Sequence, residues 1–168
     1  MTVWTIGVYG FTQTTFLAAL RVAGAPRLLD VRQRRGVRGP DYAWANSVRL
    51  QAALAEAGIA YEHHRELAPT TELRQLQYAE DARAGVGKRS RVRLAADYER
   101  RYTAEILDRA DLRPVIAALP AALLCVERDA QACHRSLIAA RLAVEYGVEI
   151  RHLTPPRPEQ DSNLRPTP

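Results

Sequence analysis

The side chains most able to carry out chemistry lie close together in the stretch LLCVERDAQACHRSLIAARL. This stretch holds both cysteines of the chain, Cys125 and Cys133, together with Glu127, His134 and Arg135. Thiolates act as nucleophiles or metal ligands, imidazole and carboxylate groups transfer protons, and guanidinium groups bind phosphates and carboxylates. The stretch therefore indicates a reaction centre, or else a corner in which these side chains only hold a helix against a strand.

The two cysteines are predicted to have different environments. Cys125 lies among aliphatic residues in an expected strand, where a cysteine is usually a small apolar core residue. Cys133 is expected near the first turn of a helix, where the helix dipole and the free N–H groups favour a thiolate, and Arg135 acts in the same direction. We therefore predict that Cys133 is a nucleophile or an anion-sensitive thiol, and that His134 is an acid or base or a hydrogen-bonded orienter. Glu127 is predicted to act as a base or to position His134, or else to form a salt bridge with one of the many arginines.

A metal site is the less favoured interpretation of these residues. Cys125, Glu127, Cys133 and His134 all carry atoms that bind metal ions, but their spacing matches no structural zinc pattern such as paired C-x2-C motifs. A buried cysteine on a strand is also expected to point away from its neighbours in the sequence, because side chains alternate between the two faces. No metal ligand is predicted, and the sequence identifies no cofactor.

Aliphatic runs that are typical of buried strands alternate with amphipathic helical patterns along the chain. Strands are expected at residues 3–8, 26–32, 59–64, 121–127 and 148–153, and helices at residues 12–24, 47–58 and 133–146. This alternation predicts a three-layer α/β fold with a mostly parallel, Rossmann-like sheet and helices on both faces. We expect one domain over residues 1–153, with a helical insertion at about 70–110 and a disordered, proline-rich tail at 154–168.

Polar side chains follow the expected strands directly. Asp30 and Arg32 follow the second strand, and Glu127, Cys133 and His134 follow the fourth. Because the carboxyl ends of parallel strands meet at one edge of the sheet, beside the N-termini of the following helices, we expect these groups to share one cavity.

The charge of the chain favours an anionic partner. The formal net charge is +5, and the basic residues concentrate in two segments, DVRQRRGVRG at 30–39 and GKRSRVR at 87–93. Such segments bind anionic small molecules or nucleic acids, or are simply solvated loops. No stretch approaches the roughly 18 uninterrupted apolar residues of a membrane span, and the N-terminus lacks the basic region of a secretory signal. We expect a cytoplasmic protein with no membrane partner, and the sequence leaves the oligomeric state undefined.

The stretch CVERDAQACHRSLIAARL resembles the signature of the domain-of-unknown-function 488 family (DUF488), in which Cys-x-Glu, a short turn and Cys-His-Arg precede a helix. The stretches TIG, LLDVR and LQAALAEAGIAYEHHRELAP are similar to the family's other recurrent blocks, in the same order, so the resemblance covers residues 3–153. It implies the site residues Asp30, Arg32, Glu127, Cys133, His134 and Arg135.

Two further features of this resemblance concern the site. The stretch RRGVRGPDYAWANSVRLQ resembles a subgroup version of the second block and adds Arg38, Asn46 and Arg49 as candidate substrate-binding residues. Many family members have His-Ser after TIG, whereas this chain has Val8 and Tyr9. Any reaction that needs the His-Ser pair is therefore in doubt here.

Two classes of function fit these observations. The first is an enzyme acting on a phosphorylated or anionic substrate, such as a nucleotide or a modified or damaged nucleic acid. Acid and base work would then come from Asp30, Glu127 and His134, and substrate binding from Arg32, Arg38, Asn46, Arg49 and Arg135. The alternative is a nucleic-acid-binding module without chemistry, whose basic segments neutralise phosphates and whose aromatic residues stack on bases or merely pack helices; the aromatic candidates are Tyr42, Trp44, Tyr98 and Tyr102. Acids, thiol and imidazole gathered in one pocket favour the enzyme.

Overall fold

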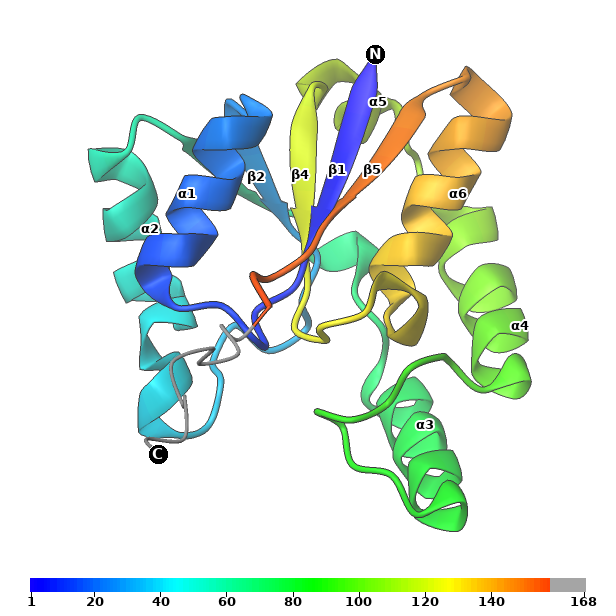
Figure 1. Ribbon diagram of the computed structural model, residues 1–168. Helices are drawn as coiled ribbons and strands as arrows, with labels where there is room; N and C mark the ends of the chain where they lie inside the picture. Colours follow the sequence, from blue (N-terminus) through cyan, green and yellow to red (C-terminus); the bar gives the residue numbers. More distant parts are fainter. Residues whose placement is uncertain (158–168) are drawn as a thin grey trace, which may run out of the picture.

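A five-stranded sheet forms the centre of the computed structural model, which describes residues 1–157 (Figure 1). All neighbouring strands are parallel, and their order is β3-β2-β4-β1-β5. The strands are β1 (Thr2–Ile6), β2 (Arg27–Asp30), β3 (Ala60–His63), β4 (Ala121–Leu124) and β5 (Glu149–Leu153). The predicted α/β fold with a parallel sheet is confirmed. Most of the predicted disordered tail, residues 158–168, lies outside the described residues.

Helices connect the strands and cover the sheet. The α-helices of residues 1–157 are α1 (Gln13–Ala23), α2 (Ser47–Glu56), α3 (Thr71–Ala84), α4 (Ala96–Glu105), α5 (Arg113–Ala118) and α6 (His134–Tyr146). Short 3-10 helices are η1 (Pro40–Ala45), η2 (Arg65–Leu67), η3 (Leu107–Arg109) and η4 (Ala130–Ala132). Helix α1 begins at the predicted cap, where the Thr12 hydroxyl accepts a hydrogen bond from the Thr15 N–H, and it ends at Gly24 with φ of +74°.

The direction of chain progression across the sheet reverses between the two central strands, β1 and β4. From β1 the chain moves through α1 and α2 to β2 and β3, whereas from β4 it moves through α6 to β5 on the opposite side. Right-handed crossovers therefore place α1 and α2 on one face and α5 and α6 on the other; Figure 1 shows α1 in front of the sheet and α5 behind it. The loops after β1 and β4 diverge at this point, which is where parallel sheets bind ligands.

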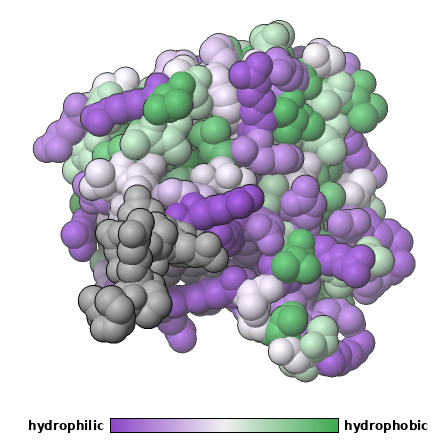
Figure 2. All heavy atoms as spheres, in the orientation of Figure 1, coloured by the Kyte–Doolittle hydropathy of each residue, from purple (hydrophilic) through white to green (hydrophobic). Residues whose placement is uncertain are grey.

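The central strands are buried on both faces. All four residues of β4 are buried, as are Val3 and Ile6 of β1, which explains their uninterrupted aliphatic character. Trp44 and Tyr102 also belong to the core. Figure 2 shows mostly polar residues over the visible face, with apolar residues scattered among them. Within residues 1–157 there is no helix that combines the length and the apolar character needed to cross a membrane.

Candidate functional site: a cationic cavity with a Cys-Cys-His cluster

A cavity of about 420 Å³ lies at the carboxyl edge of the sheet. Its wall is formed by the segments that follow β1, β2 and β4, by the loop of residues 88–94, and by side chains of α3 and α4. Buried groups of four kinds reach this wall: the thiols of Cys125 and Cys133, the imidazole of His134, the carboxylate of Glu127 and the guanidinium of Arg91. The cavity therefore brings reactive groups and charge together at the predicted position.

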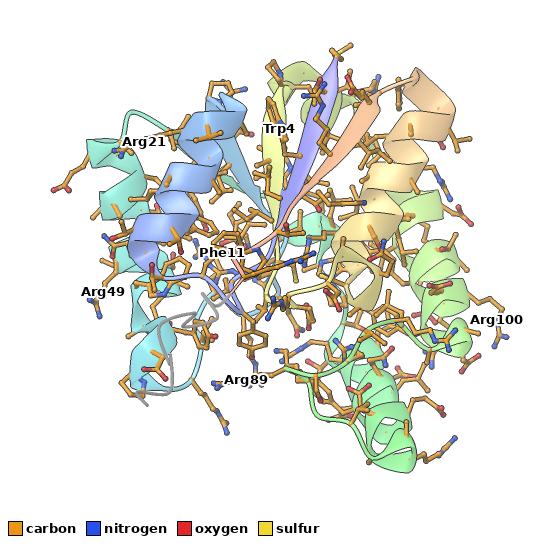
Figure 3. The ribbon with its side chains drawn as sticks, viewed as in Figure 1. Trp4, Phe11, Arg21, Arg49, Arg89 and Arg100 are labelled. Atoms are coloured by element: carbon orange, nitrogen blue, oxygen red, sulfur yellow. The ribbon has the colours of Figure 1, made fainter. Side chains whose placement is uncertain are left out.

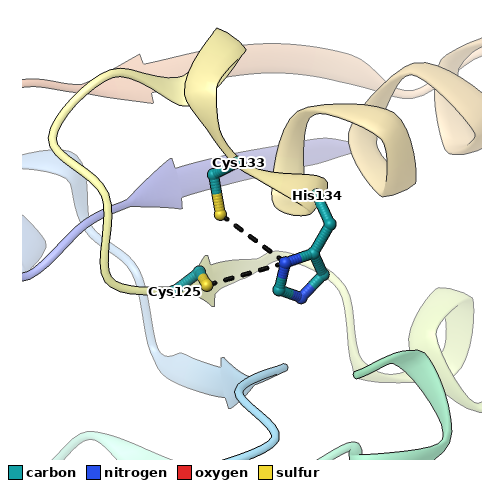
Figure 4. A group of neighbouring side chains, drawn as sticks. All are labelled: Cys125, Cys133 and His134. Carbon is teal, nitrogen blue, oxygen red and sulfur yellow. Dashed lines mark hydrogen bonds between the residues drawn. The ribbon is translucent and has the colours of Figure 1, made fainter. Parts of the chain in front are cut away.

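The two cysteines and the histidine form a compact cluster (Figure 4). The Nδ1 atom of His134 lies 3.7 Å from the Sγ atom of Cys125 and 3.7 Å from that of Cys133. The other ring nitrogen, Nε2, lies 2.8 Å from the carbonyl oxygen of Val31. A carbonyl oxygen only accepts hydrogen bonds, so Nε2 carries the proton, and in the neutral ring the lone pair of Nδ1 faces both sulfurs.

Close contact between the loops after β1 and β4 builds this cluster. The backbone N–H groups of Val8 and Tyr9 both donate to the carbonyl oxygen of Val126, each at 3.0 Å. A Cβ atom on Gly7 would collide with the carbonyl oxygen of Glu127, so only glycine allows the two loops to approach this closely. Cys133 occupies the position before the first residue of α6, and Cys125 directly follows the last residue of β4. The loop between them therefore brings the two cysteines together.

Glu127 connects the cluster to a buried ionic network. Its Oε1 atom accepts a hydrogen bond of 2.9 Å from Arg91, and its Oε2 atom lies 3.5 Å from the sulfur of Cys125. Arg91 also donates to Asp81 at 2.6 Å. Burial and the nearby Cys133 raise the pKa of Glu127, and the charges of Lys88 and Arg91 only partly oppose this rise. A carboxyl group with a raised pKa holds its proton more readily than an ordinary glutamate, as a proton-transfer group requires.

Ionisation differs between the two thiols. Burial raises the pKa of Cys133, but the hydrogen bond with Cys125 and the charges of His134 and Arg135 outweigh burial and hold that pKa well below its ordinary value. Burial, followed by the interaction with Cys133, raises the pKa of Cys125 well above its ordinary value. Burial lowers the pKa of His134, yet Cys133 reverses this and the pKa is raised. These directions favour the thiolate at Cys133 over Cys125; that Cys133 acts as a nucleophile stays a prediction.

Positive charge dominates the rest of the cavity wall. Arg34, Arg38, Arg74 and Lys88 line it, and none of them forms an ion pair with another residue among positions 1–157. Burial lowers the pKa of Lys88, but Glu127 and nearby tyrosines outweigh burial, so its pKa is raised and its charge retained. Glu127 is the only acidic residue that the described part of the chain contributes to the wall. The cavity therefore favours an anion.

Five predicted site residues line the cavity, namely Arg32, Arg38, Glu127, Cys133 and His134. Asp30 lies behind the wall with no exposed surface. Its carboxylate accepts hydrogen bonds from Arg32 at 2.9 and 2.8 Å and from the Tyr61 hydroxyl at 2.6 Å. Arg32 in turn donates to the carbonyl oxygen of Ala45 at 2.9 Å. The Asp30–Arg32 pair thus holds the segment after β2 in place.

Three other predicted substrate-binding residues lie outside the cavity wall. The side-chain oxygen of Asn46 accepts a hydrogen bond of 2.7 Å from the N–H of Val37 and so supports the basic loop. Arg49 is exposed on the outer side of α2 (Figure 3). Arg135 is buried and donates to the carbonyl oxygens of Glu127 and Arg128, at 2.7 and 3.2 Å. Arg135 therefore fixes the loop after β4.

Sequence reasoning did not select Cys125, Lys88 or Arg91 as site residues. For Cys125 a signal exists: it precedes Glu127 by two positions, and in extended chain such residues point the same way. Lys88 and Arg91 belong to the second basic segment, which turns into the cavity. Arg89 between them lies over the rings of Tyr9 and Tyr42, at 5.2 and 5.1 Å from the ring centroids (Figure 3).

Comparison with models of protein families gives one match. The family model of the domain of unknown function DUF488 matches residues 12–142. The chain belongs to the DUF488 family. Neither a curated protein nor a solved structure matches the chain. The DUF488 match spans β2, β4 and the start of α6, which carry the Cys-Cys-His cluster and the Asp30–Arg32 pair.

Proposed function

We propose that this DUF488 protein is an enzyme that acts on a phosphorylated or otherwise anionic substrate bound in the cavity. One observation carries the proposal: cations without acidic partners, Arg34, Arg38, Arg74 and Lys88, surround the same cavity that Cys133 reaches. Arg74 and Lys88 are partly buried, so screening of their charges by water is reduced, whereas Arg34 and Arg38 are exposed at the cavity wall and add to its positive potential.

The buried groups of the cavity supply the reaction centre. The Cys-Cys-His cluster provides the electron-rich atoms, and Glu127 provides a proton-transfer group whose pKa burial raises. His134 has both ring nitrogens engaged, with Val31 and with the sulfurs, so it serves the cluster and does not exchange protons with the substrate directly.

The size of the cavity favours a small molecule. Its volume of about 420 Å³ lies in the usual range of sites for small ligands, roughly 300–1,000 Å³. A nucleic acid could present only one extruded nucleotide to such a space. The rings of Tyr9, Tyr78 and Tyr98 on the wall offer apolar surface next to the cations, which suits a phosphorylated compound with a ring.

Titration calorimetry tests the proposal with three probes: inorganic phosphate, a nucleoside monophosphate and a short single-stranded oligonucleotide. Lys88→Ala and Arg38→Ala should each weaken binding of the monophosphate by about 10-fold or more, because each removes a charge-assisted contact. Arg21→Ala on α1 is the matched control, since Arg21 is exposed and does not line the cavity.

Three results would count against the proposal. They are absence of binding by all three probes, equal effects of the cavity and control variants, and binding of the oligonucleotide alone. The last of these, with a steep dependence on salt from counterion release, would support the nucleic-acid-binding module instead.

A further inference from the structure

The Cys-Cys-His cluster has the dimensions of a metal site. The two sulfurs and Nδ1 of His134 all lie within 4.8 Å of one another, and both sulfur–nitrogen distances are 3.7 Å. Tetrahedral zinc with bonds of about 2.3 Å to sulfur and about 2.0–2.1 Å to nitrogen separates a sulfur from a nitrogen ligand by about 3.6 Å and two sulfur ligands by about 3.8 Å. The sulfur–nitrogen distances of the cluster match the first of these values before any metal is added.

The three atoms of the cluster converge on one point. Nδ1 of neutral His134 presents its lone pair to the sulfurs of Cys125 and Cys133, which lie at the same distance from it. A metal ion fits this arrangement, because it accepts an electron pair from each of the three atoms. The hydrogen bond from Nε2 to the Val31 carbonyl is the support that metal-binding histidines usually have, since it directs the unprotonated nitrogen towards the metal.

We propose that Cys125, Cys133 and His134 bind a zinc ion, and that this ion is the reactive centre of the enzyme. The metal site follows from the cluster alone, whereas its catalytic use rests on the proposed function. Two thiolates and an imidazole are the ligand types that zinc prefers, and binding releases the remaining thiol protons to the solvent. Three protein ligands leave a fourth position for water or substrate, and all three residues line the cavity wall.

Among the described residues, Glu127 is the one carboxyl group of the cavity wall, and it adjoins the cluster. Its Oε2 atom is 3.5 Å from the sulfur of Cys125, and Arg91 holds its other oxygen. Zinc lowers the pKa of a bound water, which then gives a proton to Glu127 and forms a bond to the electrophilic atom of the substrate. The bond to the leaving group breaks, and the leaving group takes the proton from Glu127. The substrate class is thus a hydrolysable anionic compound, held by cations such as Lys88 and Arg38.

The inference is tested on the metal-free full chain, kept reduced with a phosphine. Zinc content after dialysis should reach about one ion per chain, and cobalt(II) should give thiolate-to-cobalt absorption together with the visible bands of a tetrahedral site. Cys125→Ser, Cys133→Ser and His134→Gln should each weaken zinc binding more than about 100-fold in competition with a chelating indicator. His64→Gln is the matched control, because His64 is buried but pairs with Glu62 and Glu66.

Cobalt absorption is measured on the unaltered protein, so a variant that fails to fold does not decide the outcome. A cobalt complex without thiolate absorption would overturn the inference, as would zinc affinity that Cys125→Ser and Cys133→Ser leave unchanged. Anion titration of the metal-free protein separates the two proposals. Binding of the monophosphate without binding of zinc would refute the metal site and leave the proposed function standing. Binding of zinc without binding of an anion would support the metal site and refute the proposed function.

Discussion

The ion pair between Asp30 and Arg32 has an exposed counterpart in the same chain. In both Asp30-x-Arg32 and Asp111-x-Arg113 the arginine donates from its backbone N–H, from Nε and from Nη2 to the aspartate, at distances that agree within 0.1 Å. The two pairs differ in burial and in their further partners. The side chains of Asp30 and Arg32 are 0% and 1% exposed, whereas those of Asp111 and Arg113 are 52% and 83% exposed. Asp30 also accepts a hydrogen bond from the Tyr61 hydroxyl, and Arg32 also donates to the carbonyl oxygen of Ala45. The exposed pair is therefore the control for a buried pair with its full set of partners.

Asp30→Asn should destabilise the fold strongly. The substitution removes the negative charge beside the Arg32 guanidinium, which is 1% exposed. The NH2 group of the new asparagine must also face a hydrogen-bond donor, either Arg32 or the Tyr61 hydroxyl. Loss of one partner from a buried ion pair costs about 3–5 kcal/mol. For a chain of 168 residues that cost lowers the melting temperature by roughly 6–20 °C. Asp111→Asn should leave the free energy of unfolding nearly unchanged, since water screens that pair.

Equilibrium unfolding in urea measures both variants. Circular dichroism and the fluorescence of Trp4 and Trp44, which are both buried, should follow one transition, and an unchanged slope against urea would assign the difference to stability. An Asp30→Asn protein as stable as Asp111→Asn would refute the reasoning. Asp30 would then return as a candidate catalytic base, since its carboxylate would not be required to hold Arg32.

Two further substitutions test the contacts that shape the site, each against a matched control. Gly7→Ala should lower the free energy of unfolding by about 1–3 kcal/mol, because the new methyl group forces the loops after β1 and β4 apart. Gly87→Ala should be neutral, because the nearest atom to its new Cβ is Ser90 Oγ at 3.9 Å. Equal stability of the two variants in urea would contradict the predicted collision at Gly7. Tyr102→Phe should lower the free energy of unfolding by about 0.5–1.5 kcal/mol, because the carbonyl oxygen of Leu67 loses a hydrogen bond of 2.6 Å in the core. Tyr146→Phe, at an exposed tyrosine, is the control, and thermal unfolding of both variants measures the difference.

Local patterns account for most of the fold. The uninterrupted aliphatic residues of β4 are buried only in a sheet that is covered on both faces. Thr12 and Gly24 are residue types that favour the start and the end of a helix, and they flank α1. The ends of the strands were less predictable. β1 ends at Ile6 and not at Val8, because the N–H of Val8 bonds to the loop after β4, a contact that no local pattern contains.

The site was predictable for the residues that lie close together in the sequence. Glu127, Cys133 and His134 lie within eight residues of one another, and the rule that polar residues gather at the carboxyl edge placed them in one cavity. Lys88 and Arg91 reach the same cavity from a loop between α3 and α4. A basic loop looks the same in sequence whether its side chains face solvent or a buried carboxylate, so the partner Glu127 could not be assigned in advance.

Arg135 contacts the loop after β4 through backbone carbonyl groups. Its guanidinium is buried and bonds only to the carbonyl oxygens of Glu127 and Arg128, and Nε finds no acceptor among the described residues. A buried charge without an opposite charge is costly. The cost is reduced when a negative charge forms close by, and the charge of Arg135 does lower the pKa of Cys133. The guanidinium thus both fixes the loop that carries Glu127 and favours the thiolate, which is the state in which Cys133 attacks an electrophile or binds a metal ion.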